Sequence, residues 1–270
     1  MTTEIDLTGQ VAVVTGGGGG IGEATAHALA TAGAHVVVAE IDEQRAKDNV
    51  ERIRAAGHSA DAVVVDVTKQ QGVDQLASTV QAADVLVNNV GHYLHPRSFV
   101  ESDAAHWDAL HSVNVWHVFA CSRAFLPGMV ERGGGSIINV TSVEGLRGYP
   151  PDPVYGAYKA AVTHFTRCLA LEVAQHGVRV NAIAPDVTQS LQVDYEKLVP
   201  QELRDRWPVW VPLGRVGEPA DSADVIVFLA SSLSRFVTGQ VIPTDGGTLV
   251  AGGWFRTAGH GRWTNRPRNP

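Results

Sequence analysis

A run of five glycines near the start of the chain, Gly16–Gly20, constrains the fold more than any other feature. The apolar run Val11–Val14 before it is typical of a buried strand, and the amphipathic stretch Gly22–Ala32 after it is typical of a helix. A glycine-rich turn between a strand and a helix lets backbone N–H groups approach a pyrophosphate, and the helix N-terminus adds partial positive charge. The motif therefore predicts a dinucleotide site. The loop residues that we expect to line it are Gly16, Gly19, Gly20 and Ile21.

Short apolar runs and longer amphipathic stretches alternate through most of the 270 residues. The predicted strands are Val11–Val14, His35–Ala39, Ala62–Val65, Asp84–Asn88, Ser136–Val140, Val178–Ile183 and Val241–Pro243. The predicted helices are Gly22–Ala32, Glu43–Ala56, Gly72–Ala82, Ala104–Arg132, Tyr155–Gln175 and Ala220–Ser232. Because the strands are almost continuously apolar, they are typical of parallel strands buried on both faces. The pattern predicts an α/β fold with a doubly wound parallel sheet of about seven strands.

The domain organisation follows from the absence of any linker rich in Pro, Gly or Ser. We expect one dinucleotide-binding and catalytic domain over residues 1–250. The long segment Asp186–Glu218 breaks the alternation, and an insertion of this length is more often a functional lid than a plain connector. Residues 251–270 have no periodicity and carry four arginines and no acid. We expect this tail to be an ordered extension that pairs with the acidic surface of its own or a neighbouring subunit.

Composition excludes several functional classes. A net charge of −7 and a pI of about 5.8 argue against nucleic-acid binding, which needs a basic surface. No apolar run approaches the ~20 residues of a membrane span, and no signal peptide is visible. The two cysteines, Cys121 and Cys168, form no C-x-x-C pair, which favours a reducing cytoplasm. The closely spaced histidines lack the H-E-x-x-H pattern, so we expect no metal site.

An acidic residue, Glu40, ends the second predicted strand, 24 positions after Gly16. This spacing is close to the ~20 residues expected for the acid that binds the adenine ribose. A carboxylate there accepts from the ribose hydroxyls and repels a 2′-phosphate. No Arg or Lys lies in the glycine loop or at Ile41, so the sequence favours NAD(H) over NADP(H). Asp42 is a competing candidate.

Of the five tyrosines, only Tyr155 has a lysine four residues later, Lys159, on the same face of a helix. A free phenol titrates near pH ~10, and a nearby cation lowers its pKa toward the range of a general base. Ser142 follows a predicted strand, at the sheet edge where open α/β sheets bind ligands. We expect Ser142 to hydrogen-bond a substrate oxygen and Tyr155 to move the substrate proton.

Taken together, these motifs resemble the short-chain dehydrogenase/reductase family over roughly residues 7–250. Thr15–Gly22 resembles the family's Thr-Gly-x-x-x-Gly-Ile-Gly loop, and 88–91 resembles its Asn-Asn-Ala-Gly motif. Asp66-Val67 after the third predicted strand also matches. The resemblance implies a single-domain Rossmann-type fold and a homotetramer. It also implies a catalytic tetrad consisting of Asn114, Ser142, Tyr155 and Lys159.

The resemblance assigns further roles. Asp66 and Val67 would bind the adenine, Asn89 and Gly91 would lie along the cofactor's ribose, and Lys159 would bind the nicotinamide ribose. Asn114 would hold a water that connects Lys159 to solvent. Pro185 and Thr188 would support the nicotinamide carboxamide, and Ser190 would reach the pyrophosphate. The sequence departs from the family at three positions. These are Val90 for alanine, Asp186 for the glycine after Pro185, and His117 where glycine is frequent.

The predicted function is NAD(H)-dependent interconversion of a secondary alcohol and a ketone by hydride transfer. The aromatic residues Tyr195, Trp207 and Trp210 of the expected lid, together with Trp254 of the tail, favour a bulky hydrophobic or cyclic substrate of terpenoid, aryl or steroid type. Alternatively, these aromatics pack the lid and tail against the domain. Two other functions stay open: a 3-oxoacyl-acyl-carrier-protein reductase, and a non-catalytic dinucleotide sensor on the same fold. The sequence names neither the substrate nor the direction of the reaction.

Overall fold

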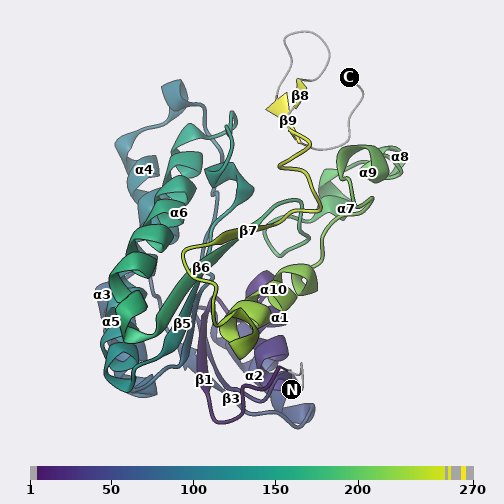
Figure 1. Ribbon diagram of the computed structural model, residues 1–270. Coiled ribbons are helices and arrows are strands. Elements are labelled where there is room, and N and C mark those ends of the chain that lie inside the picture. The colour runs from purple at the N-terminus through teal and green to yellow at the C-terminus, as the bar shows by residue number, and fades with distance from the viewer. Residues whose placement is uncertain (1–4, 253–254, 257–262, 266–270) are drawn as a thin grey trace.

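The computed structural model describes residues 5–252, 255–256 and 263–265. Its centre is a seven-stranded parallel sheet in the order β3-β2-β1-β4-β5-β6-β7 (Figure 1). The strands are β1 Val11–Thr15, β2 His35–Glu40, β3 Ala60–Val64, β4 Val85–Asn88, β5 Gly135–Val140, β6 Val178–Pro185 and β7 Val241–Thr244. The strand order reverses direction between β1 and β4. This sheet confirms the predicted doubly wound α/β fold.

Helices cover both faces of the sheet (Figure 1). One face packs against α1 Gly20–Thr31, α2 Glu43–Ala55 and α10 Pro219–Ala230. The other face packs against α3 Gln70–Val80, α5 His117–Arg132 and α6 Pro153–Val173. Five of the six predicted helices are therefore present, with ends that move by one or two residues.

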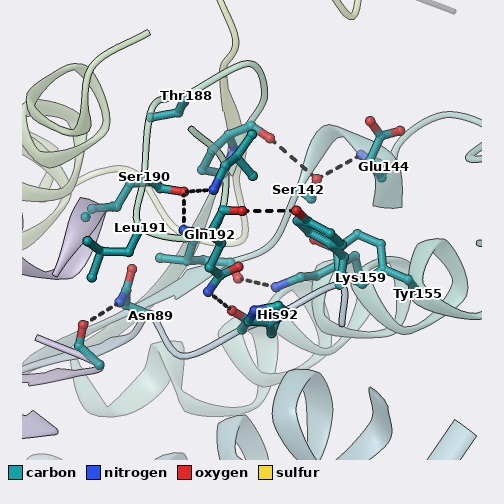
Figure 2. A pocket seen from close by; sticks show the side chains of 18 of the residues that line it. Asn89, His92, Ser142, Glu144, Tyr155, Lys159, Thr188, Ser190, Leu191 and Gln192 are labelled. Carbon is teal, nitrogen blue, oxygen red and sulfur yellow. Dashed lines mark hydrogen bonds between the residues drawn. The ribbon is translucent and has the colours of Figure 1, made fainter. Parts of the chain in front are cut away.

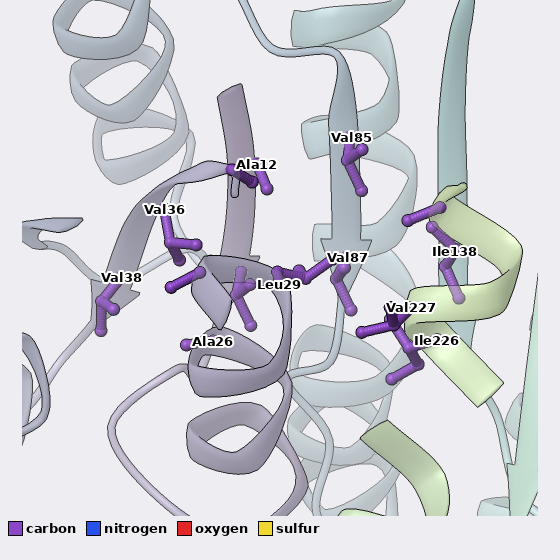
Figure 3. Packing of buried hydrophobic residues seen from close by; sticks show 14 of the residues in the cluster. Ala12, Ala26, Leu29, Val36, Val38, Val85, Val87, Ile138, Ile226 and Val227 are labelled. Atoms are coloured by element: carbon purple, nitrogen blue, oxygen red, sulfur yellow. The ribbon is translucent and has the colours of Figure 1, made fainter. Parts of the chain in front are cut away.

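Two continuous layers of apolar side chains hold this arrangement together. Figure 3 shows side chains of one of these layers: Leu29 of α1 and Ile226 of α10 belong to the same cluster as Val87 of β4 and Ile138 of β5. These side chains are fully buried. Burying side chains of this size stabilises the fold by roughly 1.5–3 kcal/mol each, before the conformational entropy that folding loses is counted. The five inner strands, β2, β1, β4, β5 and β6, have no solvated face, which is why their sequences do not alternate. The edge strands β3 and β7 keep exposed positions, such as Val64, which is 41% exposed.

One predicted helix, Ala104–Arg132, is interrupted. The structure divides it into α4 Ala104–His111, the π-helical turn η2 Ser112–Trp116, and α5. The prediction of a single regular helix was wrong because the 3.6-residue pattern continues through the π-turn without a Pro or Gly to mark it. π-turns are frequent at functional sites, and this one carries Asn114.

The predicted lid, Asp186–Glu218, contains three short helices: α7 Tyr195–Leu198, α8 Gln201–Arg204 and α9 Trp207–Trp210. The described part of the tail forms two short antiparallel strands, β8 Phe255–Arg256 and β9 Trp263–Thr264. Both segments lie at the same end of the molecule in Figure 1. Several tail residues lie outside the described residues. They are Trp254 and three of the four tail arginines: Arg262, Arg266 and Arg268. Short 3-10 turns complete the fold: η1 Phe99–Glu101, η3 Val143–Gly145, η4 Ala174–His176 and η5 Ser232–Ser234.

Two features are absent from the described residues. None of the helices in 5–252 is long and apolar enough to cross a membrane. Within the same described part of the chain, no group of three or more His, Cys, Asp or Glu side chains is placed to hold a metal ion.

Candidate active site

A cavity of about 790 Å³ opens at the carboxyl ends of the strands, where open α/β sheets bind their ligands. The glycine loop, the ends of β4, β5 and β6, the start of α6 and the lid all contribute to its wall. The predicted site residues that line it are Gly16, Gly19, Gly20, Ile21, Glu40, Asn89, Gly91, Ser142, Tyr155, Lys159, Pro185, Thr188 and Ser190. Asp66 and Val67 line a smaller cavity of about 160 Å³, which shares Gly16 and Glu40 with the main one.

The glycine loop forms an open cradle at the N-terminus of α1. Gly16 and Gly20 have φ of +63° and +56°, a conformation that glycine adopts without strain. A side chain at Gly22 would collide with the carbonyl of Gly16, so the loop and the helix can approach this closely only with glycine there. Asn89 braces the loop by donating from Nδ2 to the carbonyl oxygens of Thr15 at 3.0 Å and Gly16 at 3.1 Å. The cradle fits a pyrophosphate bound by backbone N–H groups.

Glu40 ends β2 with its side chain turned toward this loop. Its Oε2 accepts from Gly18 N at 3.0 Å, and its Oε1 accepts from the backbone N–H groups of Ile41 at 3.0 Å and Asp42 at 3.2 Å. The carboxylate is only 7% exposed and forms an ion pair with Arg45 at 3.1 Å. Arg45 also lines the cavity. This cation was not predicted, because only the glycine loop and Ile41 were considered as sources of a basic residue. Arg45 lies in the first turn of α2, which places it next to the end of β2.

Asp42, the other candidate for the acid that binds the adenine ribose, caps a helix. Its carboxylate caps α2 by accepting from Arg45 N at 3.0 Å. This hydrogen bond lowers the pKa of Asp42 below its ordinary value. Asp42 does not line either cavity, so Glu40 is the better placed acid.

Ser142 and Tyr155 face the cavity from different elements (Figure 2). Ser142 follows β5, and its hydroxyl accepts from Glu144 N at 3.2 Å. Tyr155 lies in the first turn of α6, next to the cap Asp152. Burial, and then the nearby carboxylate of Glu144, raise the pKa of Tyr155, while a hydrogen bond with Ser142 lowers it. In the protein alone, the phenol is therefore protonated at neutral pH.

Lys159 lies one turn further along α6 and is 3% exposed. Its Nζ donates to Val140 O at 3.2 Å and lies 5.8 Å from the centre of the Tyr155 ring. Burial lowers the pKa of Lys159 to about 8. A side chain at Gly91 would crowd this ammonium group, which explains the glycine there.

Asn114 is buried behind the cavity wall rather than in it. Its Nδ2 donates to His92 O at 2.8 Å and Leu110 O at 3.0 Å, and its Oδ1 accepts from His92 N at 3.1 Å. These bonds tie the π-turn η2 to the segment after β4. Asn114 is therefore fixed beside Gly91 and near Lys159, as the resemblance implied.

The lid crosses the cavity from the β6 side. Gln192 donates from its side-chain Nε2 to Gly91 O at 2.8 Å (Figure 2). The backbone carbonyl of Gln192 accepts from the Tyr93 hydroxyl at 3.1 Å. Leu191 contacts the glycine loop at Gly19. Leu191 and Tyr195 line the cavity, and of the three lid aromatics named from the sequence only Tyr195 is among the described lining residues. Trp207 and Val211 pack instead with Tyr195 in a separate apolar cluster of the lid. The expectation that the lid tryptophans face the substrate was therefore wrong, because they form the lid's own core.

The sequence argument also missed a buried charged cluster next to Ser142. Arg147 pairs with Glu144 at 3.1 Å and with Asp186 at 2.9 Å, and all three side chains are 10% exposed or less. Glu144 and Asp186 line the cavity. No sequence pattern signals these contacts, because Arg147 and Asp186 are far apart in the chain.

Comparisons with known proteins agree with this geometry. Residues 16–248 match the sequence family described as enoyl-(acyl carrier protein) reductase. The 3-oxoacyl-acyl-carrier-protein reductase of Thermotoga maritima is 37% identical over 248 residues, which cover 90% of this chain and 99% of that protein.

Solved structures are similarly close. A candidate NAD(P)-dependent gluconate 5-dehydrogenase from Beutenbergia cavernae, with NADP at low occupancy, has a TM-score of 0.85 at 36% identity and covers 92% of this chain and 99% of that one. A 7α-hydroxysteroid dehydrogenase in complex with NADH and 7-oxo glycochenodeoxycholic acid has a TM-score of 0.85 at 32% identity and covers 92% and 98%. With the fold, the cavity and these relatives in agreement, the chain belongs to the short-chain dehydrogenase/reductase family of oxidoreductases.

Proposed function

We propose that this protein interconverts a secondary alcohol and a ketone by hydride transfer with NAD(H). The observation that carries the proposal is the meeting of Ser142, Tyr155 and Lys159 in the same cavity as the glycine cradle and Glu40. A bound nicotinamide supplies the hydride chemistry and, when oxidised, a positive charge beside the phenol. The residues of the chain position the substrate and move the proton.

In the proposed mechanism, Ser142 donates a hydrogen bond to the substrate oxygen and Tyr155 accepts the hydroxyl proton. Lys159 stabilises the phenolate through its charge, because its buried ammonium group lies close to the ring. Asn114, held by the backbone of His92, connects Lys159 to solvent for proton release. Ketone reduction uses the same groups in reverse.

The preference for NAD(H) rests on Glu40, which is fixed where a 2′-phosphate would meet its charge. Arg45 weakens the repulsion but is itself paired with Glu40. Asp66 and Val67, at the smaller cavity, would hold the adenine, while Pro185 and Thr188 would support the carboxamide. The relatives carry NADP in one structure and NADH in another, so the test must compare the two cofactors directly.

For the substrate, we propose a bulky hydrophobic or cyclic alcohol or ketone. Besides the predicted site residues, the cavity is lined by three tyrosines, Tyr93, Tyr149 and Tyr195, and by Pro96 and Pro151. Aromatic rings of this kind bind apolar and ring-bearing molecules. The free cysteines, Cys121 and Cys168, support a reducing cytoplasm as the site of action.

The experiment is a spectrophotometric assay of NADH formation and consumption with a panel of secondary alcohols and ketones, repeated with NADP(H). Turnover of cyclic alcohols with NAD⁺ supports the proposal. Efficient reduction of acetoacetyl-coenzyme A with NADPH would instead favour the 3-oxoacyl reductase that the Thermotoga maritima relative represents. Tight NADH binding without turnover on any substrate would favour the dinucleotide sensor.

A further inference from the structure

The carboxylate of Asp186 connects four separate segments of the chain. Its Oδ2 accepts from Arg147 Nη2 at 2.9 Å and from Thr248 Oγ1 at 2.5 Å. Its Oδ1 accepts from Val187 N at 2.9 Å and from Asn265 Nδ2 at 3.5 Å. The donors come from the loop after η3, the loop after β7, the start of the lid and the end of β9. One buried side chain therefore joins the C-terminal segment to the catalytic edge of the sheet.

Charge keeps this carboxylate in place. Arg147 lies between Asp186 and Glu144, and it donates to both oxygens of Glu144, at 3.1 and 3.3 Å. Buried charges are tolerated only where they are paired and hydrogen-bonded. Asp186 therefore has a fixed position from which its second oxygen can hold another segment.

The C-terminal segment held by Asp186 belongs to the wall of the active-site cavity. Thr264, only 4% exposed, and Asn265 line the same cavity as Ser142 and Tyr155. The antiparallel pairing of β8 with β9, in which Phe255 is opposite Thr264, fixes the position of Thr264 relative to β8. Both lining residues lie beyond residue 248, where the match to the family ends. This part of the wall is thus an addition to the family's common core.

Asn265 presents an unused hydrogen-bond acceptor. Its Nδ2 is directed to Asp186, while its Oδ1 is buried and has no hydrogen-bond partner among residues 5–252, 255–256 and 263–265. A buried acceptor without a donor is unfavourable. Because Asn265 lines the cavity, a small rotation of its side chain would bring Oδ1 to a ligand hydroxyl there, and that ligand would gain affinity.

We propose that Asp186 holds residues 263–265 as a wall of the substrate cavity and that Asn265 determines specificity by accepting a hydrogen bond from a second hydroxyl of the substrate. This inference rests on the proposed alcohol dehydrogenase function and refines it. It favours a cyclic alcohol that carries a further hydroxyl group away from the reacting carbon.

The specificity test compares cyclohexanol with 1,4-cyclohexanediol, which share a ring and differ by one hydroxyl. In Asn265→Leu, we expect KM for the diol to rise about five- to tenfold, the loss of roughly one hydrogen bond, while KM for cyclohexanol stays within twofold. Because both substrates use Tyr155, the ratio of their kcat/KM values cancels any change in its pKa. An unchanged ratio would overturn the role of Asn265.

The contact by which Asp186 holds residues 263–265 is tested without turnover, by hydrogen exchange of the backbone amides of these residues. In Asp186→Gly we expect at least tenfold faster exchange there than in the unaltered protein. Asp194→Ala is the matched control. Among the described residues, every hydrogen bond of this carboxylate lies within the lid, so the substitution should leave this exchange unchanged. Equal exchange in Asp186→Gly and the unaltered protein would refute the proposal that Asp186 holds residues 263–265. This readout needs neither cofactor nor substrate, so failure to find an oxidised alcohol would count against the proposed function alone.

Discussion

At the proposed adenine-ribose end of the cavity, we expect one carboxylate, Glu40, and one guanidinium, Arg45, to set the balance between the two cofactors. We expect the unaltered protein to have a higher kcat/KM with NAD(H) than with NADP(H). Glu40→Ala should shift this ratio toward NADP(H) by about 10- to 100-fold. The reason is that the substitution removes the repulsion and also frees Arg45, now paired at 3.1 Å, to bind the 2′-phosphate.

Arg45→Ala is the matched variant for this test. It removes the cation and leaves Glu40 bonded to the backbone of Gly18, so preference for NAD(H) should increase. Equal or better use of NADP(H) by the unaltered protein would contradict the assignment of Glu40.

Tyr155 is the residue on which the proposed chemistry depends. Tyr155→Phe should lower kcat by about 10²–10⁴-fold while the affinity for NADH, measured by fluorescence, changes only a few-fold. Because burial and Glu144 raise the pKa of the phenol, the rate of alcohol oxidation by the unaltered protein should increase with pH as the phenolate forms. A variant that keeps a tenth of the activity would remove Tyr155 from the mechanism.

His117 gives the protein a pH-dependent stability. The ring is fully buried in α5, and neither nitrogen has a hydrogen-bond partner within the described residues. Burial, and then the charge of Lys159, lower its pKa from 6.5 to about 3; the carbonyls of Val113 and Val90 oppose this shift without completing a hydrogen bond. Between these pH values the unfolded chain binds a proton that the folded chain does not, so stability falls as pH falls.

The measurement is urea unfolding at a series of pH values. His117 should contribute a loss of up to about 1.4 kcal/mol of unfolding free energy per pH unit as pH decreases from about 6.5 toward 3. His117→Leu cannot take up a proton, so its stability curve should be flatter over this window. Parallel curves for the two proteins would show that His117 is not the group responsible.

Among the elements, α6 has the most direct influence on the proposed catalysis because it carries both Tyr155 and Lys159. It begins at a cap that is fully buried: Asp152 accepts from Val154 N and Tyr155 N at 3.1 Å, and pairs with His106 at 2.8 Å. Asp152→Ala should lower the free energy of unfolding by about 2–4 kcal/mol, through loss of the cap and of a buried hydrogen bond. It should also lower kcat, since the first turn of α6 positions the phenol.

Asp152→Asn separates these effects. Asparagine caps helices as well as aspartate does, so this variant should recover most of the stability that the alanine variant loses. Chemical denaturation and steady-state kinetics provide both readouts. If Asp152→Ala is as stable and active as the unaltered protein, the cap does not hold the catalytic turn.

Some elements could be predicted from local signals and others could not. The glycine run and the apolar strands each have a residue-level signature. The Asp152-Pro153 start of α6 has one as well, although the predicted helix began two residues later, at Tyr155. The π-turn around Asn114 has none. The position of the lid tryptophans was also predicted wrongly, because aromatic residues that line a cavity and aromatic residues that form a small separate core give the same composition. Only packing shows that Trp207 contacts Tyr195, at 5.4 Å between ring centres, rather than the cavity.

For the whole molecule, the proposed homotetramer remains a prediction. The outer face of α5 and α6 carries Phe119, 40% exposed, and Leu171, 83% exposed, and Phe119 packs against Phe165 at 4.5 Å between ring centres. An apolar face of this kind is typical of an interface between copies. Light scattering at micromolar concentration should therefore give four times the mass of 28.7 kDa.

Phe119→Asp should yield a smaller species that still has the circular dichroism of a folded protein. Val100→Asp is the control, because Val100 is 95% exposed and belongs to η1 rather than to α5 or α6. A monomer in the unaltered protein would exclude the tetramer. Equal assembly in Phe119→Asp would place the interface elsewhere.

The sequence by itself determined the fold class, the dinucleotide cradle and the identity of Tyr155, Lys159, Ser142 and Glu40 as candidates. These features depend on spacing within one element or one turn, and on the rule that parallel strands end at a common edge. The tertiary structure decided which distant groups surround them. Arg45 reaches Glu40, Asp186 meets Arg147 and Asn265, and the lid tryptophans turn inward only because separate elements pack together. Contacts of this kind depend on the free energy of the whole packed chain, which no local pattern records.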